Sequence, residues 1–309
     1  MFTRFLVVLG QVSTLFLMMA VGFVLGKWKK ITAAGTGEMS SLLLYVVSPC
    51  IIIDSFQTDY APALLRTLAL GAVVELAFFF LYAMIVKLFF RKEDEDTRIP
   101  FRFGAMYGNT GFMGLPLIQA IMGDEALIFA VVSLMVFNVV VWSHGYMMMN
   151  GSARGFSLKK ALLTPGLLAV VVGVPLFLTQ TTLPGVLHTA VSYIGSMNTP
   201  LAMVVIGAQM ARADLGALLR DKKLFEASAL KLVLIPIFTA IVLLPLRHDP
   251  LLYTATVILA AAPTAGITSM FAERFGRAPE RTAGLVSLST LLSIFTLPVI
   301  AVAAEALAG

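Results

Sequence analysis

The sequence predicts an all-α polytopic membrane protein with ten transmembrane helices, arranged as two inverted repeats of five helices. Apolar residues make up 59% of the 309 residues and charged residues only 13%, whereas a soluble domain has about 25% charged residues. The apolar residues form ten runs long enough to span a bilayer, and helix-breaking or polar residues recur in both halves at nearly one spacing. This composition excludes an ordinary soluble protein.

Ten apolar runs define the helices that we expect, since a spanning helix needs about 20 apolar residues. The first run is too long for the apolar core of a signal peptide, so we interpret it as a transmembrane helix. The connections are short and leave no room for a domain outside the membrane. The predicted helices cover residues 5–26, 39–57, 62–90, 101–122, 126–149, 160–179, 186–211, 224–245, 251–272 and 282–306.

Lysine and arginine residues predict the orientation of these helices. Of the 22 such residues, 18 follow the odd-numbered helices, and only Arg4, Arg66 and Arg247 lie in the alternate loops. Basic loops stay in the cytoplasm, so we expect both termini on the non-cytoplasmic face. The basic residues thus set topology in the lipid bilayer, and we expect no nucleic-acid partner.

An odd number of helices in each half forces the second half to enter the membrane from the opposite side. This is the inverted-repeat arrangement of many secondary transporters. We place the two halves at residues 1–150 and 151–309. Three pairs of polar or helix-breaking residues match between the halves at separations of 151 to 154 residues. The pairs are Pro49 with Pro200, Asn109 with Pro263, and Asn138 with Thr290.

The fourth and ninth predicted helices carry residues that disfavour a regular helix. An interior glycine costs about 1 kcal/mol and a proline about 3 kcal/mol. Broken helices at matching positions of two halves predict a binding site at mid-membrane. The residues that we expect to break helices are Gly108, Gly114, Pro116, Pro49 and Pro200. The residues that we expect to bind substrate are Asn109, Thr110, Gly111, Pro263, Thr264, Ala265 and Gly266.

Such breaks predict the charge of the ligand. A broken helix presents the N-terminal end of a half-helix, with about half a positive charge. Two crossing breaks would aim two such ends at one place, and Asn109 and Thr110 would add neutral donors. The sequence therefore predicts an anion site without a buried arginine or lysine. In an alternative interpretation the glycines only allow close helix packing, which explains neither Asn109 nor the break at Pro263.

Two ionisable residues, Glu75 and Lys231, could lie deep in the membrane. Glu75 is in the third helix, where a carboxylate costs roughly 2.5–3.5 kcal/mol, and we interpret it as a candidate proton carrier. Lys231 either pairs with Glu75 in a structural role or extends its ammonium to the cytoplasmic edge. Asn138 and Thr290 are further candidates for ion coupling, although hydroxyls in helices often bond their own backbone. No metal-ligand spacing or catalytic constellation occurs, so we expect neither a cofactor nor an enzyme.

Two segments resemble the auxin efflux carrier family, which includes plant auxin exporters and bacterial organic-acid permeases. Asn109-Thr-Gly-Phe-Met-Gly-Leu-Pro116-Leu looks like the family's helix-4 signature, and Ala262-Pro263-Thr-Ala-Gly-Ile is similar to its helix-9 region. Asn138 stands where plant relatives carry a glutamine, and the similarity spans the whole chain. Gly108 replaces a proline of the plant members, and their long loop between the halves is missing. These departures favour the bacterial branch.

The resemblance implies a fold similar to that of bile-acid and sodium–proton transporters, in which helices four and nine cross. Scaffold helices within 1–57 and 160–211 would form the frame, as a homodimer. Transport helices within 62–149 and 224–306 would move against that frame like an elevator.

The resemblance also implies a function. Asn109 would bind a substrate carboxylate, and Glu75 and Asn138 would lie behind the crossing. We therefore expect a secondary carrier of small organic anions, mono- or dicarboxylates such as malonate or malate, in a bacterial inner membrane. Its coupling ion would be a proton or sodium, or it would respond to membrane potential alone. The rival hypotheses are an auxin-like aromatic carboxylate exporter, a carrier of neutral solutes, and a membrane sensor or intramembrane enzyme.

Overall fold

The computed structural model describes residues 2–57, 62–151, 163, 165–212 and 215–308. Within these ranges the chain is all-helical and has no β-strand, and one isolated antiparallel bridge joins Gly108 to Thr264. The start of the sixth predicted helix and the basic residues Arg154, Lys159 and Lys160 lie outside the described residues.

The α-helices are numbered along the chain, and η marks π-helical or 3₁₀ turns. The first half contains α1 (Phe2–Lys27), α2 (Ala33–Leu42), η1 (Leu43–Val47), α3 (Ser48–Ser55), α4 (Pro62–Val86), α5 (Glu95–Met106), η2 (Thr110–Gly114), α6 (Leu115–Met122), η3 (Asp124–Ala126), α7 (Leu127–Val140), η4 (Val141–Gly145) and α8 (Tyr146–Asn150). The second half contains α10 (Pro165–Thr179), α11 (Gly185–Ser196), α12 (Asn198–Met210), α13 (Leu215–Leu218), α14 (Lys222–Ala229), η5 (Leu230–Leu234), α15 (Ile235–Leu243), η6 (Leu244–Leu246), α16 (Pro250–Ala261), α17 (Ile267–Phe275) and α18 (Pro279–Ala308).

Six of the helical segments are long and apolar enough to cross a membrane. They are Ala33–Ser55, Leu65–Val86, Asp124–Asn150, Gly185–Met210, Lys222–Leu246 and Pro279–Ala308. Shorter apolar helices are Ser13–Lys27, Thr110–Met122, Pro165–Thr179 and Pro250–Ala261. The chain is therefore a multi-pass membrane protein. Its count of ten spans and its inverted repeat stay predictions.

The third predicted helix is shorter than expected, because α4 ends at Val86 instead of residue 90. The guanidinium of Arg102 donates to the carbonyls of Lys87 and Phe89 at 2.7–2.9 Å, which satisfies acceptors beyond the helix end. The next helix starts earlier than expected, at Glu95, because Asp94 caps it by accepting from the backbone N–H of Thr97. Both boundary differences come from polar partners in a loop.

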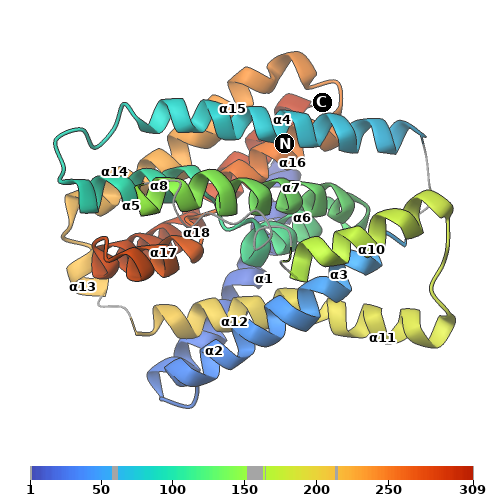
Figure 1. Cartoon of the computed structure of the whole chain (residues 1–309), viewed down its shortest axis with the longest axis horizontal. Coiled ribbons are helices and arrows are strands. Elements are labelled where there is room, and N and C mark those ends of the chain that lie inside the picture. Colours follow the sequence, from blue (N-terminus) through green and yellow to red (C-terminus); the bar gives the residue numbers. More distant parts are fainter. Residues whose placement is uncertain (1, 58–61, 152–162, 164, 213–214, 309) are drawn as a thin grey trace.

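The helices gather into two groups, each with members from both halves of the chain (Figure 1). In one group α3 lies against α10 and α11, and α12 packs on α1 and α2. In the other, α4 packs on α7, and α18 packs on α14, α16 and α17. The groups meet where α1 contacts α6 and α18 and where α12 contacts η2 and α6, so the unwound part of the chain before η2 lies near their junction.

Helices α1 and α12 approach each other more closely than any side chain would allow. A Cβ at Gly22 would collide with the backbone carbonyl of Val204, and a Cβ at Gly207 would collide with that of Met19. Small residues let membrane helices gain van der Waals contact between their backbones. The two glycines therefore fix this pair as one tightly packed unit.

Prolines in these helices change the winding without unwinding the backbone. Pro49, Pro116 and Pro236 each stand second in an α-helix that follows a π-helical turn, η1, η2 and η5. A proline ring clashes with the carbonyl four residues earlier, and a wider π turn moves that carbonyl away. We predicted breaks at Pro49, Pro116, Gly114 and Pro200, but the described backbone stays helical at all four. Gly108 lies in an unwound segment, and Pro200 is the third residue of α12, which begins directly after the turn at Met197 that separates it from α11.

Candidate functional site

The fourth predicted helix is interrupted just before its Asn-Thr-Gly segment. Helix α5 ends at Met106, Tyr107 and Asn109 have non-helical backbone angles, and η2 begins at Thr110. The Asn109 side-chain oxygen accepts from the backbone N–H of Phe112 at 3.2 Å. Asparagine is a strong N-cap because its oxygen satisfies a donor that the first turn leaves free. Asn109 thus starts the second half-helix, which runs on through α6.

The ninth predicted helix is interrupted around Pro263. Helix α16 ends at Ala261, and α17 begins at Ile267. Proline has no backbone N–H and cannot continue the hydrogen-bond ladder of the helix. The five residues between the two helices are buried except Gly266.

The two unwound segments cross and bond to each other. The backbone N–H of Asn109 donates to the Pro263 carbonyl at 2.7 Å, and the N–H of Ala265 donates to the Tyr107 carbonyl at 3.0 Å. These two bonds form the antiparallel bridge between Gly108 and Thr264. The sequence predicted two breaks that meet, and the structure brings them together.

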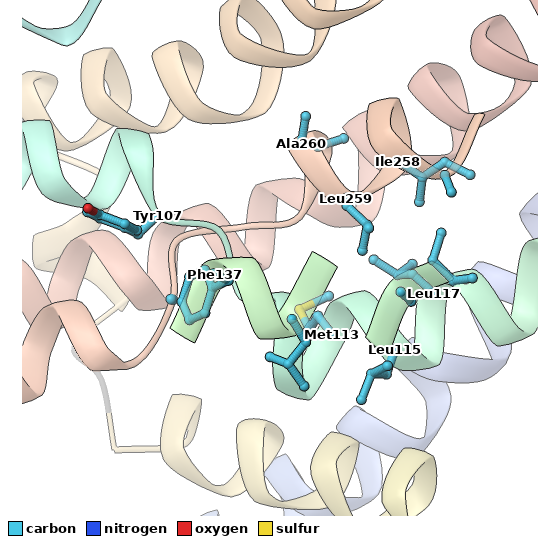
Figure 2. Close-up of a cluster of buried hydrophobic side chains, with 14 of the residues drawn as sticks. Tyr107, Met113, Leu115, Leu117, Phe137, Ile258, Leu259 and Ala260 are labelled. Carbon is cyan, nitrogen blue, oxygen red and sulfur yellow. The ribbon is translucent and has the colours of Figure 1, made fainter. Parts of the chain in front are cut away.

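Apolar side chains surround this crossing. Figure 2 shows Met113, Leu115 and Leu117 on one half-helix and Ile258 and Leu259 on the other, with Leu259 pointing toward the helix that carries Met113. All five are buried. Polar groups inside such a shell have no water to bond, so each unpaired donor or acceptor there is costly.

The hydroxyl and the backbone N–H of Thr264 both form hydrogen bonds that hold the crossing together. Thr264 is fully buried, its hydroxyl donates to the Gly104 carbonyl at 3.0 Å, and its backbone N–H donates to the Ser289 hydroxyl at 3.2 Å. No sequence pattern indicated Ser289, whereas its neighbour Thr290 was predicted as a candidate for ion coupling. The hydroxyl of Thr290 instead donates to the carbonyl of Val286 in its own helix at 2.8 Å.

Several donors at the crossing have no acceptor among the described residues. They include the side-chain nitrogen of Asn109 and the backbone N–H groups of Gly111 and Gly266. None of these residues is fully buried. Gly111 and Gly266 stand at the N-terminal ends of the two half-helices, where the helix dipole favours negative charge. The arrangement therefore suits an anion with hydrogen-bond acceptors.

The side chain of Tyr107 anchors the first unwound segment among aromatic rings. Its ring is fully buried and lies 4.3 Å from the Phe103 ring and 5.6 Å from the Phe79 ring, between centroids. Its hydroxyl forms a 2.8 Å hydrogen bond with Nδ1 of His144. This aromatic anchor holds the extended backbone in place, and no motif in the sequence indicated it.

Lys231 corrects the prediction of a site without a buried cation. Its side chain is only 1% exposed, and its ammonium donates to the Ala260 carbonyl at 2.9 Å. A Cβ added at Gly108 would lie 2.8 Å from this ammonium. The side chain thus points at the crossing and does not extend to the membrane edge as we had proposed.

Glu75 lies half-buried on α4 and forms no hydrogen bond or ion pair among the described residues. It interacts electrostatically with Lys231, but no oxygen–nitrogen contact within 4.0 Å joins them. The side-chain nitrogen of Asn138 donates to the Leu134 carbonyl of its own helix at 2.9 Å. Among the described residues Glu75 thus interacts with Lys231, which lies at the crossing, whereas the Asn138 nitrogen is bonded within its own helix.

The comparisons with known proteins agree with this picture. The sequence profile of the family described as "Membrane transport protein" matches residues 7–158 and 152–301. The chain belongs to this family, the auxin efflux carrier family. In the described residues of this family member, no three histidine, cysteine, aspartate or glutamate side chains cluster closely enough to hold a metal ion.

Two relatives carry names that bear on function. A Methanothermobacter thermautotrophicus protein described as "Uncharacterized transporter" is 26% identical over 192 residues, which are 62% of this chain and 63% of the relative. The chain thus spans less than two thirds of that relative. A Rhizobium meliloti protein described as "Putative malonate transporter" is 22% identical over 299 residues, 93% of this chain and 92% of the relative. Membership of the family makes this chain a membrane transport protein.

Proposed function

We propose that this family member is a secondary carrier of small organic anions and that the crossing binds their carboxylate. The observation that carries the proposal is the presence of unpaired donors at the crossing, among them those of Asn109, Gly111 and Gly266. Each stands at the positive end of a half-helix, and the Asn109 amide adds a neutral donor. Hydrogen bonds to a charged acceptor are worth about 1.5–3 kcal/mol each, which suits a carboxylate.

The substrate class is a mono- or dicarboxylate such as malonate or malate. The name of the Rhizobium relative supports this choice, and so does the buried Lys231 ammonium beside the crossing, which adds positive charge. An aromatic carboxylate, handled by an exporter of the auxin type, uses the same carboxylate chemistry. A neutral solute would leave both half-helix ends and the Lys231 charge without a matching group.

The architecture that we propose has ten spans in two inverted repeats. Scaffold helices within 1–57 and 160–211 form a dimeric frame, and transport helices within 62–149 and 224–306 carry the crossing past it by an elevator movement. The two groups of helices in Figure 1 support this division. The asymmetry of basic residues supports non-cytoplasmic termini in a bacterial inner membrane.

For ion coupling we propose that Glu75 carries a proton. It is a carboxylate in a membrane helix, without an ion pair among the described residues, and such residues mark proton relays. Asn138 and Thr290 would support it from the neighbouring helices. Coupling to sodium is the competing proposal.

Ligand-induced stabilisation tests the site, because a ligand that binds only the folded state raises its melting temperature. At a concentration of 100 times Kd the gain is about 2.7 kcal/mol. Malonate, malate and an aromatic carboxylate are titrated against the detergent-purified protein and two variants. Asn109→Ala removes both the cap and the free donor, whereas Asn109→Ser replaces the carboxamide by a shorter hydroxyl, whose oxygen can cap the helix while the amide NH₂ is lost.

We expect malonate or malate to stabilise the wild type and neither variant to respond at the same concentration. The Ser variant should nevertheless melt near the wild type without ligand, since its cap is intact. Equal stabilisation of all three proteins would place the anion site elsewhere. A response to aromatic acids alone would favour the exporter hypothesis. No response to any acid would favour a neutral solute.

A further inference from the structure

The Lys231 ammonium donates to a backbone carbonyl, that of Ala260, whose helical hydrogen-bond partner is lost at the interruption. In a regular helix the Ala260 carbonyl would accept from the backbone N–H of Thr264. That N–H is turned away and donates to Ser289 instead. The Ala260 carbonyl receives the Lys231 ammonium in its stead, at 2.9 Å.

A second carbonyl belongs to the same cluster. The position of a Cβ on Gly108 would be 2.8 Å from the Lys231 nitrogen and 3.3 Å from the Ala262 carbonyl oxygen. The ammonium thus lies at the C-terminal end of α16 and directly against the first unwound segment. This end of the half-helix carries the negative pole of its dipole, opposite to the ends that hold the free donors.

Carbonyls of unwound membrane helices and the C-terminal ends of half-helices are the groups that coordinate sodium in secondary transporters. Here the Ala260 carbonyl bonds the Lys231 ammonium, a cation that is part of the chain. Among the described residues no carboxylate lies within 4.0 Å of the ammonium, and Glu75 interacts with it only at longer range. The Ala260 carbonyl is therefore its direct hydrogen-bond partner.

The backbone around Lys231 fits this role. The residue lies in the π-helical turn η5, which precedes Pro236, and its whole side chain is 1% exposed. Position 108 is glycine, and a methyl group there would lie only 2.8 Å from the Lys231 nitrogen, which is too close for an unstrained contact. The position that a Cβ on Gly108 would take is thus already filled by the charged end of Lys231.

We propose that the Lys231 ammonium is a resident cation that holds the Ala260 carbonyl at the crossing in place of sodium, so that this carrier neither binds nor requires Na⁺ there. Lys231 acts as a positioning residue, because it touches the backbone that shapes the crossing. The inference concerns the cation alone and holds for a carboxylate or a neutral substrate.

Thermal unfolding of the full chain in detergent tests this proposal. The wild type, Lys231→Ala and Lys231→Arg are each titrated with NaCl against choline chloride at equal ionic strength, without organic acid. We expect the wild type and the Arg variant to melt at the same temperature in both salts. The Ala variant should melt lower in choline and recover with increasing Na⁺, because the vacated space and the freed Ala260 carbonyl then accept the ion. A merely structural loss would lower its melting temperature equally in both salts.

A rise in wild-type melting temperature that is specific to Na⁺ would overturn the proposal, and so would an Ala variant that melts equally low in both salts. Should the Ala variant not fold in either salt, the wild-type and Arg titrations decide, since matched curves support a resident cation and a Na⁺-specific rise refutes it. The acid titrations of the wild type are a separate readout, so failure of the anion site would not be mistaken for failure here.

Discussion

The contact between Gly108 and Lys231 gives the sharpest prediction of stability. In Gly108→Ala the new Cβ would lie 2.8 Å from the Lys231 nitrogen and 3.2 Å from its Cε, whereas an unstrained contact needs about 3.5 Å. The lysine or the backbone must therefore retreat by about 0.7 Å. The ammonium is buried and bonded to Ala260, so we expect an overpacking cost of about 1–3 kcal/mol.

Gly111→Ala is the matched control. Its Cβ would meet nothing closer than the Leu134 methyl at 3.6 Å, which is an ordinary contact. Neither Gly108 nor Gly111 has a positive φ, so both alanine variants gain about 0.4–1 kcal/mol from a less flexible unfolded chain. The difference between the variants isolates the contact, and we expect it to be roughly 2–6 °C at about 2 °C per kcal/mol.

A double-mutant cycle with Lys231→Ala completes the test. Without the Lys231 side chain, the closest contact left for the new Cβ is the Ala262 carbonyl oxygen at 3.3 Å, so most of the cost should vanish and the two substitutions should couple by about 1–3 kcal/mol. Thermal unfolding in detergent measures all four proteins. Additive effects, or a Gly108→Ala variant as stable as Gly111→Ala, would refute the placement of the ammonium against the unwound segment.

Three further predictions concern single groups. Thr264→Val should lower stability by about 1 kcal/mol because the Gly104 carbonyl loses its hydroxyl donor, while Thr264→Ser should stay near the wild type in the same melting assay; equal losses would show that the methyl group matters more. Glu75→Gln should abolish the pH dependence of radiolabelled acid uptake into proteoliposomes, and an unchanged pH profile would rule out Glu75 as the proton carrier. Hydrogen bonding by Thr97 lowers the pKa of Asp94 below its ordinary value of 3.8, so its charge stabilises the fold above that pH and this contribution is lost as pH falls further. The melting temperatures of the wild type and Asp94→Asn, measured between pH 3 and 6, should therefore converge at the acid end; a gap that widens there would contradict this sign.

The positions of the two interruptions could be predicted from the sequence because their causes are local. Proline lacks a donor at Pro263, and asparagine after glycine favours a new helix start at Asn109. The same local reasoning overstated the effect of Pro49 and Pro116. A π-helical turn accommodates each proline ring. Such a turn leaves no recognisable periodicity in the sequence, so it could not be predicted.

The partners of the freed groups could not be predicted, because they depend on how distant helices pack. A spacing of 152 residues pointed to Thr290, but the side chain that faces the crossing is Ser289, one residue away and about 100° around the helix. Lys231 illustrates the same limit. The sequence predicted that Lys231 lies in a membrane helix. It could not predict where the ammonium points, because that depends on the Ala260 carbonyl of a distant helix.

The crossing also constrains the biosynthesis of the chain. The Asn109 N–H and the Tyr107 carbonyl bond only to residues about 155 positions later, which a ribosome adds roughly 8–30 s afterwards at 5–20 residues per second. During that interval the first unwound segment has its backbone in or near lipid without its native partners. The first half of the protein therefore cannot complete its fold before the second half is inserted, and a chain truncated between the halves should present this exposed segment to the quality-control proteases of the membrane.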